Sequence, residues 1–262
     1  MAEELFELAM TAPGVWSASG KERFQQPNGS QFGGYVSGLM VSATLGEPTK
    51  RGMPIAMTGA FMSRVQVGPL QIHTTRLRSG STLEFWQAAI FQNDALCAQA
   101  TITLAQRPES SPDFGWIAMP EAPPPETLAR DVYEPPAPPT LNTFDNRSVR
   151  AGPGLRPKDG VSVCWTKDDN GAPMDYPRLA MFADKFGPRA MFATGRHVAS
   201  STVSFSTYFH ASESEVAGIG TEYILQEGRG RRGSHGTCDL TAAMWRRDGL
   251  LLATTEQLCW FR

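Results

Sequence analysis

The sequence predicts an α+β fold made of two tandem units, each an antiparallel sheet that wraps around one helix. Three observations lead to this prediction. Each half of the chain contains one apolar stretch long enough for a helix, four runs of alternating apolar and polar residues follow it, and a proline-rich segment lies between the halves. Alternation with a period of two residues is typical of strands that bury one face.

The proline-rich segment divides the chain. Ten of the twenty prolines fall between Pro108 and Pro139, and proline is tolerated neither in a helix interior nor in a central strand. We therefore predict an N-terminal domain over residues 1–107, a linker over 108–147 and a C-terminal domain over 148–262.

The N-terminal half contains the segment "QFGGYVSGLMVSAT", whose apolar part predicts a helix over 33–45. Two adjacent glycines at its start are unexpected, because glycine costs about 1 kcal/mol relative to alanine inside a helix. Strands are predicted to follow over 56–67, 70–79, 82–93 and 95–106.

The C-terminal half repeats this plan, with a helix predicted over 176–187 and strands over 201–211, 218–227, 236–249 and 250–262. The last runs of the two halves, "LCAQATITLAQR" and "LLATTEQLCWFR", correspond closely, which indicates an internal repeat. A lone helix and a curved sheet bury their apolar faces best when the sheet wraps the helix. This is the hotdog fold, so the chain is predicted to be a double hotdog.

Composition and charge describe an ordinary globular chain of 262 residues with 41% hydrophobic and 19% charged residues. A formal charge of −2 gives no general attraction for nucleic acid or an anionic membrane. No run approaches the roughly 18 apolar residues of a membrane helix, and the acidic opening lacks the basic start of a secretory signal. We therefore expect a cytoplasmic protein. The four cysteines lack the spacing of a metal site and are predicted to be buried thiols: Cys97, Cys164, Cys238 and Cys259.

Several segments, taken in order, resemble the acyl-CoA thioesterase II family and its thioesterase-like double-hotdog relatives over nearly the whole chain. In the first half they are "FGGYVSGLMVSA" (32–43), "AFMSRVQVGPL" (60–70) and "TRLRSGST" (75–82). In the second half they are "FADKF" (182–186), "TVSFSTYFH" (202–210) and "DGLLLATTEQ" (248–257). The resemblance implies hydrolysis of an acyl-CoA substrate to a free acid and coenzyme A without a metal or cofactor. It also implies a tendency to form homo-oligomers.

The same resemblance implies a catalytic set that binds water. Asp184, Thr202 and Gln257 stand where the family has an Asp on the second helix, a Thr or Ser on the next strand and a Gln on the final strand. A carboxylate accepts a proton from water, while a hydroxyl and an amide fix its orientation. Ile102 aligns with Gln257 in the first repeat, so we expect one such site per chain.

Each of these three residues also has an ordinary structural interpretation. Asp184 has apolar neighbours that would raise its pKa unless hydrogen bonds favour its charged form, yet it could equally be exposed near a helix end. Threonine is common in strands. Gln257 could face solvent; if buried it needs partners, because an unpaired amide costs roughly 1–3 kcal/mol.

Gly33 and Gly34 allow two interpretations. Unpaired N–H groups at a helix start favour negative charge, and absent side chains let a carbonyl oxygen approach. The pair is therefore a candidate substrate-binding turn that faces the oxyanion or the pantetheine. The alternative is close packing of the helix start against the sheet.

A glycine-rich connection, "EGRGRRGSHG", carries three candidate ligands for the phosphates of coenzyme A: Arg229, Arg231 and Arg232. A solvated hairpin loop is the alternative. The connection also spells GxGxxG, but no strand-to-helix unit follows, which argues against a dinucleotide site. Thr58 departs from the family, since members close to acyl-CoA thioesterase II carry a His there.

The leading hypothesis is therefore an acyl-CoA thioesterase in which water attacks the thioester directly. The alternative is a non-catalytic module that binds acyl-CoA or an acyl carrier and releases no thiol. A hotdog hydratase is disfavoured, because it needs an Asp and His pair and no His lies at a suitable spacing from Asp184.

Overall fold

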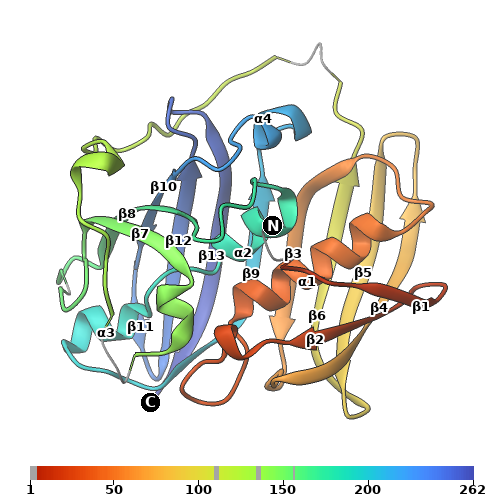
Figure 1. The fold of residues 1–262 in the computed structure, drawn as a ribbon, viewed down its shortest axis with the longest axis horizontal. Coiled ribbons are helices and arrows are strands. Elements are labelled where there is room, and N and C mark those ends of the chain that lie inside the picture. The colour runs from red at the N-terminus through yellow and green to blue at the C-terminus, as the bar shows by residue number, and fades with distance from the viewer. Residues whose placement is uncertain (1–4, 109–111, 134–136, 156) are drawn as a thin grey trace.

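A computed structural model of the protein describes residues 5–108, 112–133, 137–155 and 157–262. Within these residues thirteen strands form a single sheet in the order β1-β2-β4-β5-β6-β3-β9-β13-β12-β10-β8-β7, with β11 paired to β12. Helices α1 and α2 lie side by side against one face of this curved sheet (Figure 1). The predicted α+β double-hotdog architecture is confirmed.

The N-terminal half contains the helix and four strands that the alternation predicts, preceded by two further strands. Its elements are β1 (Ala9–Ala12), β2 (Val15–Gly20), a short 3₁₀ turn (Glu22–Phe24), α1 (Gly33–Gly46), β3 (Met53–Phe61), β4 (Gly68–Ser79), β5 (Leu83–Gln92) and β6 (Ala95–Ala105). All four residues of β1 are exposed, so this strand lacks the apolar alternation by which a strand is recognised.

The C-terminal half has the same plan with additional short elements. The elements of this half are β7 (Phe144–Arg150), β8 (Val161–Asp168), α2 (Tyr176–Phe182), α3 (Arg189–Thr194), β9 (Ser200–Phe209), α4 (Glu213–Ala217), β10 (Ile224–Arg229), β11 (Gly233–Ser234), β12 (Thr237–Trp245) and β13 (Leu251–Phe261). The strand predicted over 218–227 begins only at Ile224. The preceding residues follow α4, which Ser212 and Glu215 start with a reciprocal capping box.

The two halves join edge to edge through β3 and β9. Their antiparallel register pairs Ala56 with Tyr208 and Ala60 with Ser204. The strand order β4-β5-β6-β3 on one side of this seam is mirrored by β10-β12-β13-β9 on the other, so the repeat seen in the sequence is a pseudo-twofold repeat in space. Pairing β3 with β9 also leaves neither strand as an open edge.

The residues predicted to form the linker contain two 3₁₀ turns (Pro125–Thr127 and Pro139–Asn142) and the start of β7. Part of this segment packs on the C-terminal half of the sheet, where Trp165 Nε1 donates to Pro123 O over 2.8 Å. Met119 and Leu128 pack against a buried cluster that includes Trp165. The proline-rich segment thus covers apolar surface of the sheet in addition to connecting the halves.

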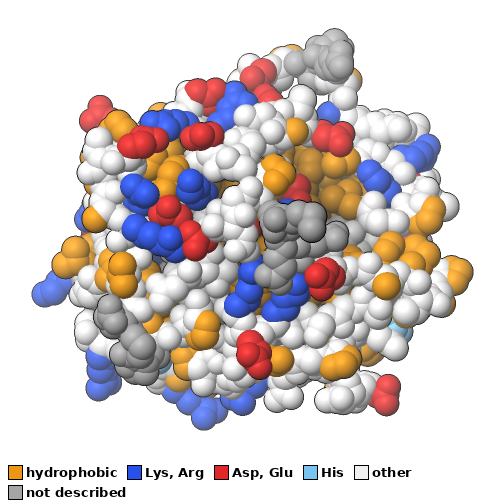
Figure 2. All heavy atoms as spheres, in the orientation of Figure 1, with side chains coloured by type: hydrophobic (Ala, Val, Ile, Leu, Met, Phe, Trp, Pro, Cys, Tyr) orange, Lys and Arg blue, Asp and Glu red, His pale blue; other side chains and the backbone are white. Residues whose placement is uncertain are grey.

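Charged side chains of both signs lie close together on part of the surface. On the face that carries the helices, blue and red side chains gather together at the upper left of Figure 2. Ion pairs such as Arg130 with Asp169 and Arg247 with Glu126 are consistent with this mixture. Among the described helices, none combines the length and the apolar character needed to cross a membrane.

Candidate active site

Asp184 lies in the turn that follows α2, two residues beyond the last helical residue, Phe182. The helix is therefore shorter than predicted. Its last turn tightens, because the N–H groups of Asp184 and Lys185 bond to carbonyls only three residues back, at Met181 (3.4 Å) and Phe182 (3.1 Å). This turn places the Asp184 carboxylate at the start of α1.

The two glycines at the start of α1 make room for this carboxylate and its turn. A Cβ atom on Gly33 would lie 2.4 Å from Asp184 Oδ2, and one on Gly34 would lie 2.2 Å from Met181 O. The backbone N–H of Gly34 also favours the charged form of Asp184 and so lowers its pKa against the effect of burial. The close packing is thus against the turn after α2, while a direct contact of either glycine with substrate stays a prediction.

Thr202 reaches the same carboxylate because of a β-bulge in β9. Ser204 pairs with Leu258 on β13, but Thr202 and not Val203 pairs with the next residue, Cys259. The extra residue, Val203, is 41% exposed. The bulge reverses the side-chain alternation, so that Thr202 points to the face that carries Asp184. There Thr202 Oγ1 donates to Asp184 Oδ1 over 3.4 Å.

Gln257 points to the same face from β13 and is buried. Its side-chain Nε2 donates to the backbone carbonyl of Ala183 over 2.9 Å, in the turn that holds Asp184. This bond resolves the choice between a buried and a solvent-facing side chain. It also leaves part of the amide available on the side of the carboxylate.

The protonation of Asp184 is set by opposing effects. Burial raises the pKa of this carboxyl from 3.8 to about 7, while hydrogen bonds from Thr202, the Gly34 N–H and Gln257 favour its charged form. The direction agrees with its apolar neighbours in the sequence. A carboxyl whose pKa lies near neutrality can both take up and return a proton.

Two aromatic rings line the site and come from different halves of the chain. Phe61 on β3 and Phe205 on β9 stack with their ring centroids 5.0 Å apart. A Cβ atom on Gly33 would lie 3.0 Å from the Phe61 ring, which places this aromatic pair beside Asp184. No local pattern in the sequence indicates the pair, because the two residues meet only through the β3–β9 seam.

The arginines predicted to bind phosphate lie apart from this set. Arg229 pairs with Glu227 (2.7 Å), and Arg231 pairs with Asp239 (2.6 Å) and Glu256 (3.3 Å). Glu256 neighbours Gln257 on β13, so its side chain points to the opposite face of the sheet. The structure therefore does not bring Arg231 together with Asp184.

The Arg232 side chain is exposed and makes no hydrogen bond or ion pair with the described residues, although its backbone N–H donates to Asp239 Oδ1 over 2.9 Å. The assignment of Arg229, Arg231 and Arg232 to coenzyme A stays a prediction.

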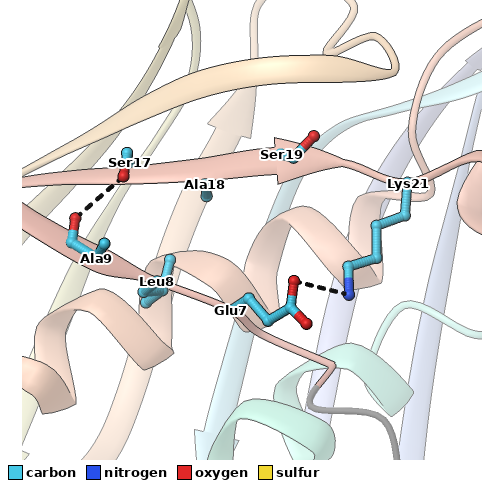
Figure 3. A pocket seen from close by; sticks show the side chains of 7 residues that line it. All are labelled: Glu7, Leu8, Ala9, Ser17, Ala18, Ser19 and Lys21. Atoms are coloured by element: carbon cyan, nitrogen blue, oxygen red, sulfur yellow. Dashed lines mark hydrogen bonds and ion pairs between the residues drawn. The ribbon is translucent and has the colours of Figure 1, made fainter.

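Two surface grooves of about 310 Å³ each are open to solvent. One crosses the β3–β9–β13 seam on the face opposite Asp184; its lining includes Thr58, which forms a 3.2 Å hydrogen bond with Ser206. The other follows the N-terminal hairpin (Figure 3), where Glu7 and Lys21 form an ion pair of 3.7 Å. Neither groove is lined by Asp184 or Thr202, although the lining of the seam groove also includes Phe205 and Gln257.

Family comparisons match both halves of the chain. A profile described as the acyl-CoA thioesterase N-terminal domain matches residues 22–105, and one described as the acyl-CoA thioesterase C-terminal domain matches residues 118–261. The two profiles occur in the order that a tandem architecture requires. A search of curated protein sequences gives no significant match.

Solved structures share the fold over nearly their full length. A hotdog protein of unknown function from Alicyclobacillus acidocaldarius is 28% identical, with a TM-score of 0.92 over 98% of this chain and 96% of its own. The acyl-CoA thioesterase II TesB2 of Mycobacterium marinum is 18% identical, with a TM-score of 0.78 over 100% and 98%. The tesB protein of Mycobacterium avium subspecies paratuberculosis is 19% identical, with a TM-score of 0.79 over 98% and 97%.

Proposed function

The chain belongs to the acyl-CoA thioesterase family, and we propose that it hydrolyses acyl-CoA thioesters by direct attack of a water molecule held by Asp184, Thr202 and Gln257. The observation that carries this proposal is the convergence of the three side chains from separate elements on the turn after α2. Each supplies a different capacity for hydrogen bonding.

The proton inventory of the site supports the role of each residue. Thr202 uses its single O–H to donate to Asp184, so its oxygen lone pairs are left to accept a hydrogen bond from water. The ionised Asp184 carboxylate accepts a proton from that water as its oxygen attacks the thioester carbonyl. Gln257, fixed by Ala183, holds the water in line with the carbonyl.

The reaction then balances without a further reactant. The bond from the water oxygen to the carbonyl carbon forms and the carbon–sulfur bond breaks. The departing thiolate takes the proton that Asp184 accepted from water, which yields the free acid and coenzyme A. The N–H groups at the start of α1 are suited to stabilise the developing oxyanion, and the Phe61–Phe205 pair offers an apolar wall for the acyl chain.

A thiol-release assay over acyl-CoA esters of graded chain length tests the proposal. We expect the wild-type chain to release coenzyme A. Asp184→Asn should lower kcat/KM by at least about a hundredfold, because asparagine cannot accept the proton of water. Asp94→Asn, at an exposed turn of the N-terminal half, is the matched control and should behave as wild type.

Two results would contradict the proposal. Thermal stabilisation by acyl-CoA without thiol release from any ester would instead support the non-catalytic binding module. A folded Asp184→Asn variant with wild-type rates would remove Asp184 from the reaction.

A further inference from the structure

Two cysteines of the C-terminal half face each other across neighbouring strands. Cys238 on β12 pairs directly with Cys259 on β13, and both are free, buried thiols. Together with Ala190 and Val198 they form a small apolar cluster, separate from the main core and bordered by α3. Of the other two cysteines, Cys97 is also buried as predicted, whereas Cys164 is only half-buried.

The register of the pair suits a disulfide. Residues directly opposite in an antiparallel pair have Cα atoms about 4.5 or 5.5 Å apart, depending on the hydrogen-bonding pattern. Both spacings fall within the roughly 4.4–6.8 Å that disulfides span. A bond between Cys238 and Cys259 therefore needs no change in strand pairing.

A buried arginine provides positive charge at this cluster. Arg189, the first residue of α3, is 5% exposed, and its Nη2 donates to Ser162 Oγ over 2.8 Å. Its Nε and Nη1 atoms have no hydrogen-bond partner, and it forms no ion pair with a carboxylate of the described residues. Gly228 accommodates the guanidinium, since a Cβ atom there would lie 2.2 Å from Nη2. A buried cation without an anion is costly, and a nearby thiolate would offset that cost.

The surroundings distinguish the two thiols. A hydrogen bond from Cys259, the backbone N–H of Ala190 and the charge of Arg189 lower the pKa of Cys238 against the effect of burial. The same hydrogen bond and burial raise the pKa of Cys259. The thiolate is the reactive form of cysteine, and the Ala190 N–H at the start of α3 and the charge of Arg189 favour it at Cys238. We therefore take Cys238 as the nucleophile of the pair and Cys259 as the partner that completes the disulfide.

The pair also contacts the proposed catalytic set. Cys259 Sγ lies 3.9 Å from Thr202 Oγ1, the hydroxyl that donates to Asp184. A sulfur bonded to Cys238 no longer carries a hydrogen and is drawn toward β12. Oxidation therefore changes the surroundings of Thr202 directly.

We propose that Cys238 and Cys259 are a modification site at which a peroxide converts the dithiol to a disulfide, and that this disulfide lowers hydrolysis by displacing Thr202. The effect on hydrolysis rests on the proposed function, whereas disulfide formation does not. In the first step the Cys238 thiolate attacks one oxygen of hydrogen peroxide, the O–O bond breaks, and sulfenic acid and hydroxide form.

The Cys259 sulfur then attacks the sulfur of this sulfenic acid. The S–S bond forms and hydroxide leaves, which takes up the Cys259 proton as water. In total, two thiols are oxidised and one peroxide is reduced to two waters.

The full-length protein, first reduced and then treated with graded hydrogen peroxide and desalted, tests this proposal. We expect loss of two titratable thiols, a mass decrease of about 2 Da and a Cys238–Cys259 cross-linked peptide, all reversed by dithiothreitol. Hydrolysis should fall at least about tenfold in the oxidised protein relative to the same protein reduced. Cys97→Ser is the matched control and should behave as wild type, whereas Cys238→Ser should give no cross-link.

A reduced protein that is inactive toward all acyl-CoA esters would overturn the proposed function, while the cross-linked peptide still decides whether the disulfide forms. Oxygen additions without the cross-link would overturn the modification site. An equal loss of hydrolysis in oxidised Cys238→Ser would overturn the link between the disulfide and Thr202.

Discussion

Two opposing effects set the pKa of Asp184, and the proton transfer proposed for this residue depends on their balance. Burial behind α1 and α2 disfavours its charge, while Thr202, the Gly34 N–H and Gln257 favour it, and the result is a pKa of about 7. A freely solvated aspartate would be ionised but weakly basic. The raised pKa makes Asp184 a better proton acceptor at neutral pH.

The pH dependence of hydrolysis should report this pKa. Only ionised Asp184 accepts a proton from water, so kcat/KM in the free protein should rise as pH increases through about 7 and level off above it. The measurement is kcat/KM from about pH 5 to about pH 9 with one acyl-CoA ester. A rate that is already maximal near pH 5 would show that Asp184 does not limit the reaction as a base.

The contribution of Asp184 to folding stability should change with pH in the opposite direction to kcat/KM. The folded pKa of Asp184, about 7, lies above its ordinary value of 3.8. Between these values the folded state keeps a proton that the unfolded state loses, so this group's contribution to stability falls as pH rises through the interval.

Asparagine stays neutral at every pH. Asp184→Asn should therefore match wild type near pH 4 and gain on the order of 1–3 kcal/mol in free energy of unfolding near pH 8, a figure reduced for the partial exposure of the side chain. Urea unfolding at the two pH values, with Asp94→Asn as the control, measures this. If the difference in free energy of unfolding between Asp184→Asn and wild type does not vary with pH, the raised pKa of Asp184 is refuted.

At the scale of single elements, the β9 bulge is the feature on which the site depends most. Strict alternation would place Val203 on the same face as Phe205, and Thr202 on the other. The shift in pairing at Leu258 and Cys259 exchanges the two. One extra residue in one strand thus decides whether a hydroxyl or an isopropyl group faces Asp184.

Substitutions at Thr202 and Val203 test which of these two side chains faces Asp184. Thr202→Ala should lower kcat/KM by at least about tenfold, because the water loses a hydrogen-bond partner, while Thr202→Ser should restore most of the rate. Val203→Ala should stay within about twofold of wild type, since this side chain is exposed. A larger effect at Val203 than at Thr202 would mean that the strand is regular and the bulge misplaced.

The elements show which parts of the structure a sequence reveals. The helix expected over 33–45 and the strands expected over 70–79, 82–93, 95–106, 201–211 and 250–262 have clear periodicity and lie close to their observed bounds. The strand expected over 56–67 is instead β3 at Met53–Phe61, and β7 and β8 were not expected as strands. The exposed strand β1 has no such pattern, and the bulge in β9 contradicts the local alternation that its own sequence shows. Asp184 was expected on the second helix but lies just beyond it, because the turn tightens after Ala183, where the N–H groups of Asp184 and Lys185 bond to carbonyls three residues back.

Long-range placement was the least accessible to sequence reasoning. Arg231 lies in a segment suited to phosphate contacts, yet its place depends on the register of β12 and β13, which pairs Asp239 with Leu258 and turns both away from Asp184. The contact between Cys259 and Thr202 depends on another register, that of β13 and β9, which pairs these two residues beside the bulge. No local pattern encodes such pairings, because they are set by which strands meet across the sheet.

At the scale of the whole molecule, the β3–β9 seam brings both halves of the chain to the candidate site. The C-terminal half supplies the three polar side chains, while the N-terminal half supplies Gly33, Gly34 and the Phe61 ring beside them. The related position in the first repeat is the fully buried Ile102. The chain therefore carries two similar folds and, among the described residues, one copy of the proposed water-binding set.

The central claim is that a water molecule attacks the thioester directly, and single-turnover hydrolysis of an acyl-CoA in oxygen-18 water tests it most directly. We expect the first-turnover acid to contain one solvent oxygen, and the protein to contain none. Unlabelled acid accompanied by label in the Asp184 peptide would contradict the account, because it would show that Asp184 attacks the acyl group itself.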